Sequence, residues 1–146
     1  MSLESYLNKS FYCCIDSLLP ATQPEQHILC NKISEQNNGK IIFYGAEEVL
    51  VLKDQPYIYK KLKRTPNIDG VVFFTVDQFC YGEKFNLNLM KKILKLQMSI
   101  HFAREQVSFN SIEDLANKLP IIISYHHSFI RSRKMFAKET KYLLSQ

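Results

Sequence analysis

Near its middle the chain reads Asp69-Gly-Val-Val-Phe-Phe-Thr-Val-Asp-Gln-Phe79. Residues Gly70 to Phe74 are glycine, β-branched or aromatic, and polar side chains follow at once. A short, continuously apolar run is typical of a strand buried on both faces, as in a parallel sheet covered by helices. Because ligands collect at the carboxyl ends of such strands, we expect Thr75, Asp77 and Gln78 to lie at a binding site.

Strands and helices alternate on both sides of this stretch. Three more strands are predicted at Lys9 to Asp16, Lys40 to Tyr44 and Met98 to Ala103. Helices are predicted between the strands, at Thr22 to Asn37, Asp54 to Arg64 and Glu83 to Gln97. This alternation requires parallel pairing with right-handed crossovers. The predicted fold class is α/β, a three-layer domain with a four- to five-stranded, mostly parallel sheet and a C-terminal helix.

Local signals set the ends of these helices. Thr22 and Glu25 form a capping box, in which each side chain bonds the backbone of the other residue. Asn37-Asn-Gly39 is expected to end the first helix with a C-cap glycine. Phe85, Leu89 and Ile93 recur at helical spacing, so we expect one apolar stripe on the helix that starts near Glu83.

The C-terminal part is harder to assign. Residues 115–119 predict a short helix that Pro120 interrupts, and residues 120–146 predict a C-terminal helical segment. The triplet at 121–123 fits either this helix or a fifth strand. With 146 residues the chain suits one domain, with its core at about residues 9–119.

Composition narrows the class of protein. Hydrophobic residues make up 46% and charged residues 23% of the chain, as in globular proteins, and no apolar run approaches the roughly 20 residues of a membrane span. The N-terminus lacks a basic start and an apolar core, so we expect no secretory signal and a cytoplasmic protein. The adjacent Cys13 and Cys14 point to opposite faces of a strand. No CxxC spacing occurs, so buried, reduced thiols are predicted, with no metal and no cofactor.

The net charge of +5 is concentrated in the tail, where five basic residues stand against one acid after Pro120. Nucleic-acid binding would need such a footprint and also a reading element, and no helix-turn-helix or zinc motif follows. We expect a solvated helix face. Phe129, Phe136 and Leu143 lie among these charges, which favours a homo-oligomer contact through the C-terminal helix.

Polar residues at the predicted strand ends form the candidate site. Candidate catalytic residues are Asp16, Asp77 and His101. Candidate substrate-binding residues are Ser17, Tyr44, Thr75, Gln78, Tyr81 and Glu105. An acid and an imidazole at one rim suit general acid–base chemistry, and carboxylates, amides and aromatic rings suit a sugar.

Structural roles remain open for the same residues. His101 alternates with Ile100 and Phe102, so it also fits a hydrogen-bonded histidine between layers. Asp16 and Asp77 also fit helix caps. Glu105 also fits an ordinary solvated acid.

Three segments resemble a known family. Pro24-Glu-Gln26, the Asp69 to Phe74 strand and His101-Phe-Ala-Arg-Glu105 are similar to motifs of the sporadic carbohydrate cluster proteins, over about residues 9–115. More distantly, the strand that ends near Asp16, the helix that opens at Pro24 and the Asp69 strand followed by Asp77-Gln-Phe79 resemble the catalytic domain of serine recombinases. The resemblance implies a resolvase-like fold and a role in making a bacterial surface polysaccharide, and it implies no particular reaction.

Recombinase chemistry does not fit the residues. Those enzymes need a serine after the first strand and arginines near the first and third strands, because phosphoryl transfer depends on positive charge. Here Cys14 stands where an arginine is expected and Asp16 where the serine is expected. We therefore expect a protein of surface-polysaccharide or sugar biosynthesis that binds or acts on a sugar or sugar nucleotide. Two alternatives are a non-catalytic scaffold subunit of a glycan pathway and a degenerate, recombinase-like nucleic-acid-binding domain.

Overall fold

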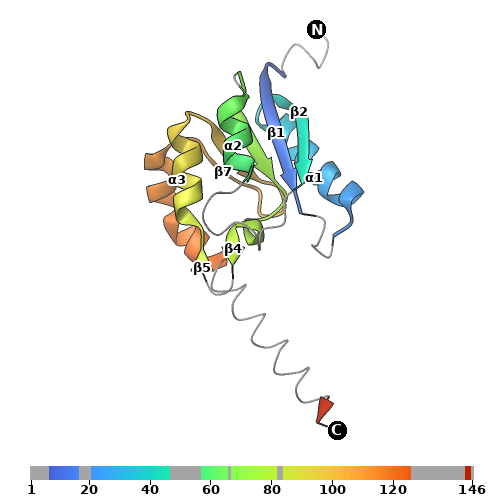
Figure 1. Ribbon diagram of the computed structural model, residues 1–146, viewed down its shortest axis with the longest axis vertical. Coiled ribbons are helices and arrows are strands. Elements are labelled where there is room, and N and C mark those ends of the chain that lie inside the picture. The colour runs from blue at the N-terminus through green and yellow to red at the C-terminus, as the bar shows by residue number, and fades with distance from the viewer. Residues whose placement is uncertain are drawn as a thin grey trace.

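The computed structural model describes residues 7–16, 21–46, 57–65, 67–81, 84–125 and 144–145. Within them a five-stranded sheet is flanked by helices on both faces (Figure 1). The predicted three-layer α/β class is therefore confirmed. Ser17, residues 47–56 and residues 126–143 lie outside the described residues, and so does the oligomer contact predicted for the C-terminal helix.

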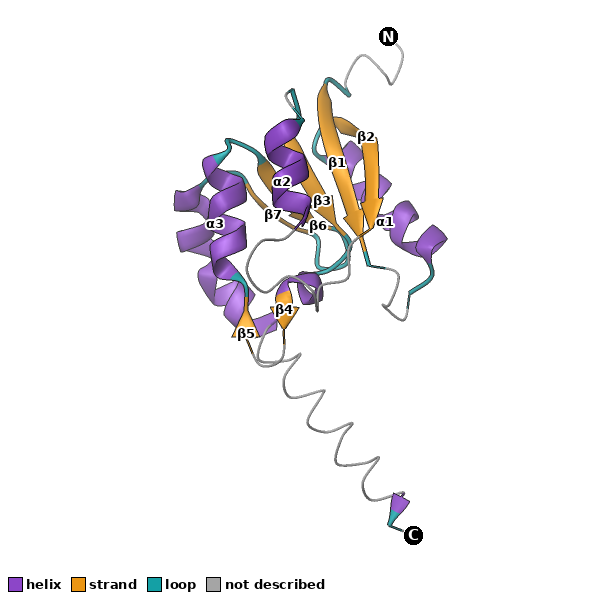
Figure 2. Cartoon of the chain, viewed as in Figure 1, coloured by secondary structure: helices purple, strands orange, loops and turns teal. Residues whose placement is uncertain are grey.

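The main sheet is mostly parallel. Its strands are β1 (Lys9–Ile15), β2 (Gly39–Ala46), β3 (Gly70–Phe73), β6 (Ser99–Phe102) and β7 (Val107–Phe109), in the order β2-β1-β3-β6-β7. The pairs β1–β2, β1–β3 and β3–β6 are parallel, and β7 runs antiparallel to β6. A separate small antiparallel pair consists of β4 (Cys80–Tyr81) and β5 (Lys84–Phe85) (Figure 2).

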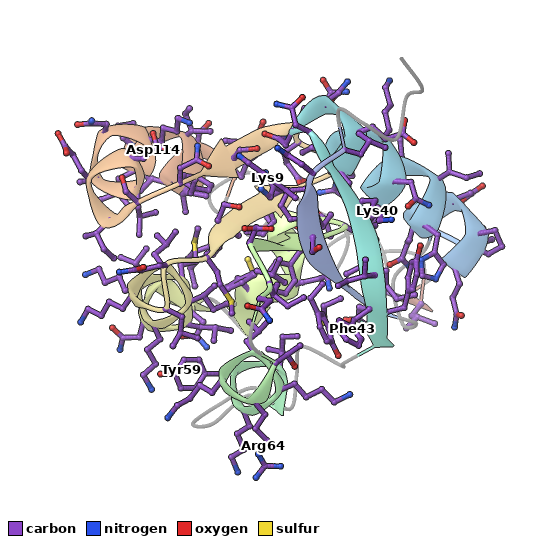
Figure 3. All side chains as sticks on the ribbon, turned by 90° about the horizontal axis from the view of Figure 1, so that it is seen from above. Lys9, Lys40, Phe43, Tyr59, Arg64 and Asp114 are labelled. Atoms are coloured by element: carbon purple, nitrogen blue, oxygen red, sulfur yellow. The ribbon has the colours of Figure 1, made fainter. Side chains whose placement is uncertain are left out.

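Helices cover the sheet unequally. They are α1 (Gln23–Gln36), α2 (Tyr57–Arg64), α3 (Leu87–Lys95) and a further helix at residues 112–125, with a short 3₁₀ helix, η3, at Val76–Phe79. Figure 3 shows α1 on one side of the sheet and α2 and α3 on the other. No helix among the described residues is both long enough and apolar enough to cross a bilayer.

The side chains of each strand alternate between two cores. Tyr12 and Cys14 of β1 belong to the larger core, under α2, α3 and the helix at 112–125, and Phe11 and Cys13 belong to the smaller core, under α1. The predicted opposite orientation of Cys13 and Cys14 is thus confirmed. Burial on both sides explains why the central strands are continuously apolar.

The fifth strand was not recognised in the sequence. Residues 121–123, for which helix and strand were both open, are helical, and the fifth strand is β7. The prediction that Pro120 interrupts its helix is wrong, because the helix continues through it. Leu115 and Ile122, on either side of the proline, are both buried in the larger core. Their burial offsets a proline penalty of about 3 kcal/mol.

One helix cap and one helix start differ from prediction for local reasons. Gly39 is not the cap of α1; Asn38 takes the left-handed conformation (φ 62°), and Gly39 begins β2 where a Cβ would meet the Phe11 ring. The third helix begins at Leu87, because the Asn86 side chain accepts a hydrogen bond from the backbone N–H of Leu89 at 3.1 Å. The capping box of Thr22 and Glu25 is present as predicted.

Candidate functional site

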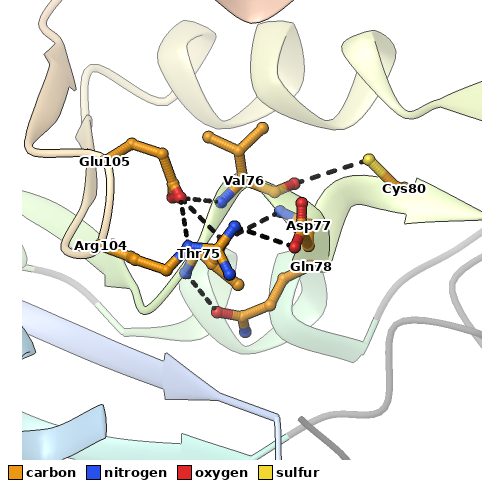
Figure 4. A network of polar contacts seen from close by, with 7 residues as sticks. All are labelled: Thr75, Val76, Asp77, Gln78, Cys80, Arg104 and Glu105. Atoms are coloured by element: carbon orange, nitrogen blue, oxygen red, sulfur yellow. Dashed lines mark hydrogen bonds and ion pairs between the residues drawn. The ribbon is translucent and has the colours of Figure 1, made fainter. Parts of the chain in front are cut away.

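A network of polar contacts lies where β3 and β6 end. Thr75, Asp77 and Gln78 follow β3, and Arg104 and Glu105 follow β6. The two strands are parallel neighbours, so their carboxyl ends meet at one edge of the sheet. Figure 4 shows the five side chains converging on this edge. The structure thus brings Thr75, Asp77, Gln78 and Glu105 to one edge of the sheet, as the sequence predicted.

Glu105 holds the network in place. Its carboxylate accepts hydrogen bonds from the hydroxyl of Thr75 at 2.8 Å, the backbone N–H of Val76 at 2.9 Å and Nε of Arg104 at 3.2 Å. Its side chain is only 3% exposed. The interpretation of Glu105 as a solvated acid is therefore wrong. The carboxylate satisfies a backbone donor that β3 leaves unpaired where it gives way to η3.

The Gln78 side chain connects β1 and β3 at the same edge of the sheet. Its Oε1 accepts from the backbone N–H of Thr75 at 3.1 Å, and its Nε2 donates to the carbonyl of Cys14 at 3.1 Å. Thr75 and Gln78 together form the capping box of η3, so the cap is Thr75 and not Asp77. Both side chains are buried. They fix the ends of β1 and β3 relative to each other.

Arg104 and Asp77 form the outward part of the network. Nη2 of Arg104 lies 3.0 Å from Oδ2 of Asp77, and the two side chains are 51% and 21% exposed. Burial by itself lowers the pKa of the Arg104 guanidinium, but the charges of Asp77 and Glu105 and the hydrogen bonds to both outweigh it, so the pKa is raised above its ordinary value. Arg104 was not among the predicted site residues. The signal for it is its place beside Glu105 in the fourth-strand motif.

Asp16 lies at the end of β1 and is also buried. Its backbone is held by Gln26, whose Oε1 accepts from the N–H of Asp16 at 3.3 Å and whose Nε2 donates to the Asp16 carbonyl at 2.9 Å. The same amide donates to the carbonyl of Ala21 at 3.0 Å. Gln26 thus binds the backbone at the end of β1, as Gln78 and Glu105 bind the backbone at the end of β3. Three buried polar side chains, those of Gln26, Gln78 and Glu105, thus fix the backbone of this edge.

His101 lies apart from the network, inside β6. Its Nε2 lies 2.8 Å from the hydroxyl of Ser99, its Nδ1 lies 2.7 Å from the hydroxyl of Ser108, and the ring packs on Phe11 at 5.0 Å. Burial, with smaller contributions from the charges of Lys9 and Lys118, lowers its pKa to about 4. These contacts match the alternative of a hydrogen-bonded histidine between the layers.

Tyr44 lies near the end of the edge strand β2. Its side chain is 55% exposed, and its ring makes an edge contact with His27 of α1 at 5.0 Å between centroids. Two strands separate β2 from β6, so Tyr44 is about 14 Å along the sheet from the end of β6. The side chain of Tyr81, like Ser17, lies outside the described residues.

The thiols and acids offer no metal site in the described part of the chain, which holds no group of three or more candidate ligands. None of the four cysteines forms a disulfide, and all four are buried, as predicted. A hydrogen bond with Cys30 and burial both raise the pKa of the Cys13 thiol. The Cys13 thiol is therefore protonated and a poor nucleophile at neutral pH.

Comparison of the chain with protein-family models gave no match, and comparison with curated proteins gave none either. The resemblance to the sporadic carbohydrate cluster proteins therefore stays a prediction that rests on the three sequence segments alone.

Proposed function

We propose that the protein binds a sugar, or the sugar part of a sugar nucleotide, at the carboxyl edge of its sheet, in the biosynthesis of a bacterial surface polysaccharide. The observation that carries the proposal is the Arg104–Asp77 pair. It is the most exposed part of a network that is otherwise buried. The polysaccharide pathway comes from the sequence resemblance.

The chemistry of the pair suits hydroxyl groups. A carboxylate accepts hydrogen bonds from two neighbouring hydroxyls, and a guanidinium donates to their oxygens from a fixed fork of N–H groups. Both side chains are partly exposed, and each holds the other in position. Because Gln78 and Glu105 fix the backbone beneath them, little conformational freedom is lost when a ligand binds.

The net charge of the network argues against phosphate as the main ligand. Asp77 and Glu105 carry two negative charges, and Arg104 carries one positive charge. A phosphate would meet a net charge of the same sign as its own, whereas a neutral hydroxyl would not. This balance supports a sugar over the recombinase-like, nucleic-acid alternative.

Binding without catalysis is the second candidate, and the contacts of His101 favour it. General acid–base catalysis needs a titrating group within reach of the substrate. Both ring nitrogens of His101 lie within hydrogen-bond distance of serine hydroxyls, and the residue is 1% exposed. A sugar-binding subunit of a glycan pathway would use groups such as the Arg104–Asp77 pair and would need no titrating base.

Ligand-observed NMR tests the proposal. The purified chain is mixed with a panel of hexoses and nucleoside-diphosphate sugars, and saturation transfer to sugar-ring protons is measured. We expect transfer to ring protons of at least one sugar, lost in Arg104→Gln and in Asp77→Asn. Loss of a single charge-assisted hydrogen bond should weaken binding by roughly tenfold or more.

Glu113→Gln serves as the control, because Glu113 is an exposed acid on the helix at 112–125. This variant changes the net charge as Asp77→Asn does but leaves the edge of the sheet intact. The proposal is contradicted if no sugar shows saturation transfer. It is also contradicted if the transfer is equal in Asp77→Asn and Glu113→Gln.

A further inference from the structure

Helices α2 and α3 present a strongly basic face. Six exposed basic side chains lie on them: Lys60, Lys63 and Arg64 of α2, and Lys91, Lys92 and Lys95 of α3. A seventh, Lys61, is half-buried. Neither helix contains an aspartate or a glutamate. We call these six residues the α2–α3 face.

The two helices lie side by side, so their charges form one surface. Nζ of Lys63, from α2, lies 5.4 Å from the centre of the Tyr59 ring, and Nζ of Lys92, from α3, lies 5.6 Å from it. Figure 3 shows Tyr59 between the two helices, seen end-on. Segments about 30 residues apart in the sequence thus contribute to one patch, which the sequence alone does not reveal.

The composition of this face is unusual for a solvated surface. Exposed helices normally mix charges of both signs, because acid–base pairs three or four residues apart stabilise the helix and repulsion is avoided. Here six of the chain's 19 Lys and Arg residues gather without an acid in either helix. None of the ion pairs among the described residues involves them. A concentration of one sign of charge fits a polyanionic partner.

We propose that the α2–α3 face adsorbs the protein to the anionic surface of a lipid bilayer. Five of the six side chains are lysines. Lysine carries a compact, strongly hydrated charge on a flexible stem, which suits a diffuse layer of anionic headgroups. Nucleic-acid readers rely instead on arginine forks and on open aromatic faces for stacking. Tyr59 is half-buried under two ammonium groups, so it offers no free face to a base.

The contact is electrostatic and shallow. The large apolar residues of the two helices, such as Ile58, Leu62 and Ile93, are buried in the larger core. No large apolar side chain described on α2 or α3 is exposed for insertion between lipid chains. Binding is therefore reversible and sensitive to salt. It does not depend on the proposed sugar binding at the edge of the sheet.

Vesicle sedimentation of the full chain tests the proposal. The probes are vesicles of phosphatidylcholine alone and vesicles of phosphatidylcholine mixed with phosphatidylglycerol, at low and high salt. We expect binding to the mixed vesicles at low salt and its loss at high salt. The triple variant Lys60→Gln, Lys91→Gln, Lys95→Gln should bind roughly 100-fold more weakly, since each lysine near an anionic surface contributes about 1 kcal/mol.

The tail supplies a matched control with the same loss of three charges, Arg131→Gln, Arg133→Gln, Lys134→Gln. We expect this variant to keep most of the binding. Circular dichroism melting verifies that both variants fold. Lys60, Lys91 and Lys95 are exposed and take part in none of the ion pairs between described residues. Three results would overturn the proposal. The chain could bind neutral and mixed vesicles equally, or only the tail variant could lose binding to the mixed vesicles. The chain could also bind a short DNA or RNA duplex more tightly than the mixed vesicles.

Discussion

The carboxylate of Glu105 accepts a hydrogen bond from the hydroxyl of Thr75 at 2.8 Å, across 30 residues of sequence. This bond joins the end of β6 to the end of β3, and the second carboxylate oxygen accepts from the backbone N–H of Val76. The edge of the sheet is therefore fixed by a buried charge with three donors. Removal of such a charge leaves those donors without a partner, which costs more than the bonds contribute in net terms.

We expect Glu105→Ala to lower the free energy of unfolding by about 3 kcal/mol, because the Val76 N–H and the Thr75 hydroxyl lose their acceptor. Glu105→Gln keeps one acceptor oxygen and should cost about 1 kcal/mol. Urea denaturation measures both. Glu113→Gln, on an exposed acid, should stay within about 0.5 kcal/mol of wild type. Equal stability of Glu105→Ala and wild type would show that the network is not structural.

A double-mutant cycle isolates the Thr75–Glu105 bond. Thr75→Val removes the hydroxyl at nearly constant volume, and the cycle pairs it with Glu105→Gln. We expect the two changes to be non-additive by about 1 kcal/mol, as for groups in direct contact. Additive effects in urea denaturation would mean that the hydroxyl and the carboxylate do not interact.

His101 should make stability depend on pH. Its pKa in the folded protein is about 4 against an ordinary value of 6.5, so the unfolded chain binds more protons between these values. Stability is then complete above about pH 6.5 and is lost as the pH falls toward 4, by about 3 kcal/mol at most. Urea denaturation from pH 7 to 4 should show this slope, and His101→Gln should reduce it. An unchanged slope in the variant would assign the effect to other groups.

The buried strands and the helix caps were predictable because their signals are local. The apolar run after Asp69 and the capping box at Thr22 need no knowledge of the rest of the chain. β7 was missed because it has three residues and one of them, Ser108, is polar. The turn before it places Gln106 at φ 55°, and glutamine is not a turn signal as glycine or asparagine is.

The site was only partly predictable, for a related reason. Parallel pairing brings Thr75, Asp77 and Glu105 to one edge whatever their exact roles. Whether a polar side chain faces a ligand or satisfies the backbone depends on donors elsewhere, such as the Val76 N–H that Glu105 binds. Arg104 is not among the predicted site residues because the recombinase pattern has its arginine after the third strand, and here the arginine follows the fourth strand of the parallel set.

Gly70 is expected to tolerate no side chain. A Cβ at this position would meet Oγ of Ser99 and would lie 2.9 Å from the Ser99 carbonyl oxygen and 3.1 Å from the Phe11 ring. Gly70→Ala should therefore lower the free energy of unfolding by about 1–3 kcal/mol. The double variant Gly70→Ala, Ser99→Ala should recover only part of this loss, since the carbonyl contact remains. Full recovery in urea denaturation would show that only the hydroxyl is in the way.

The thiols should be protected until the protein unfolds. All four cysteines are buried, and Cys13 has its pKa raised by the Cys30 hydrogen bond and by burial. Because the thiolate is the reactive form, we expect an aromatic disulfide reagent to react with the native chain at least about 100-fold more slowly than with the chain in urea. Reaction of one thiol at the unfolded rate in native buffer would contradict the burial of that cysteine. Single Cys→Ala variants, compared by mass spectrometry of the labelled peptides, would then identify which strand or helix opens first.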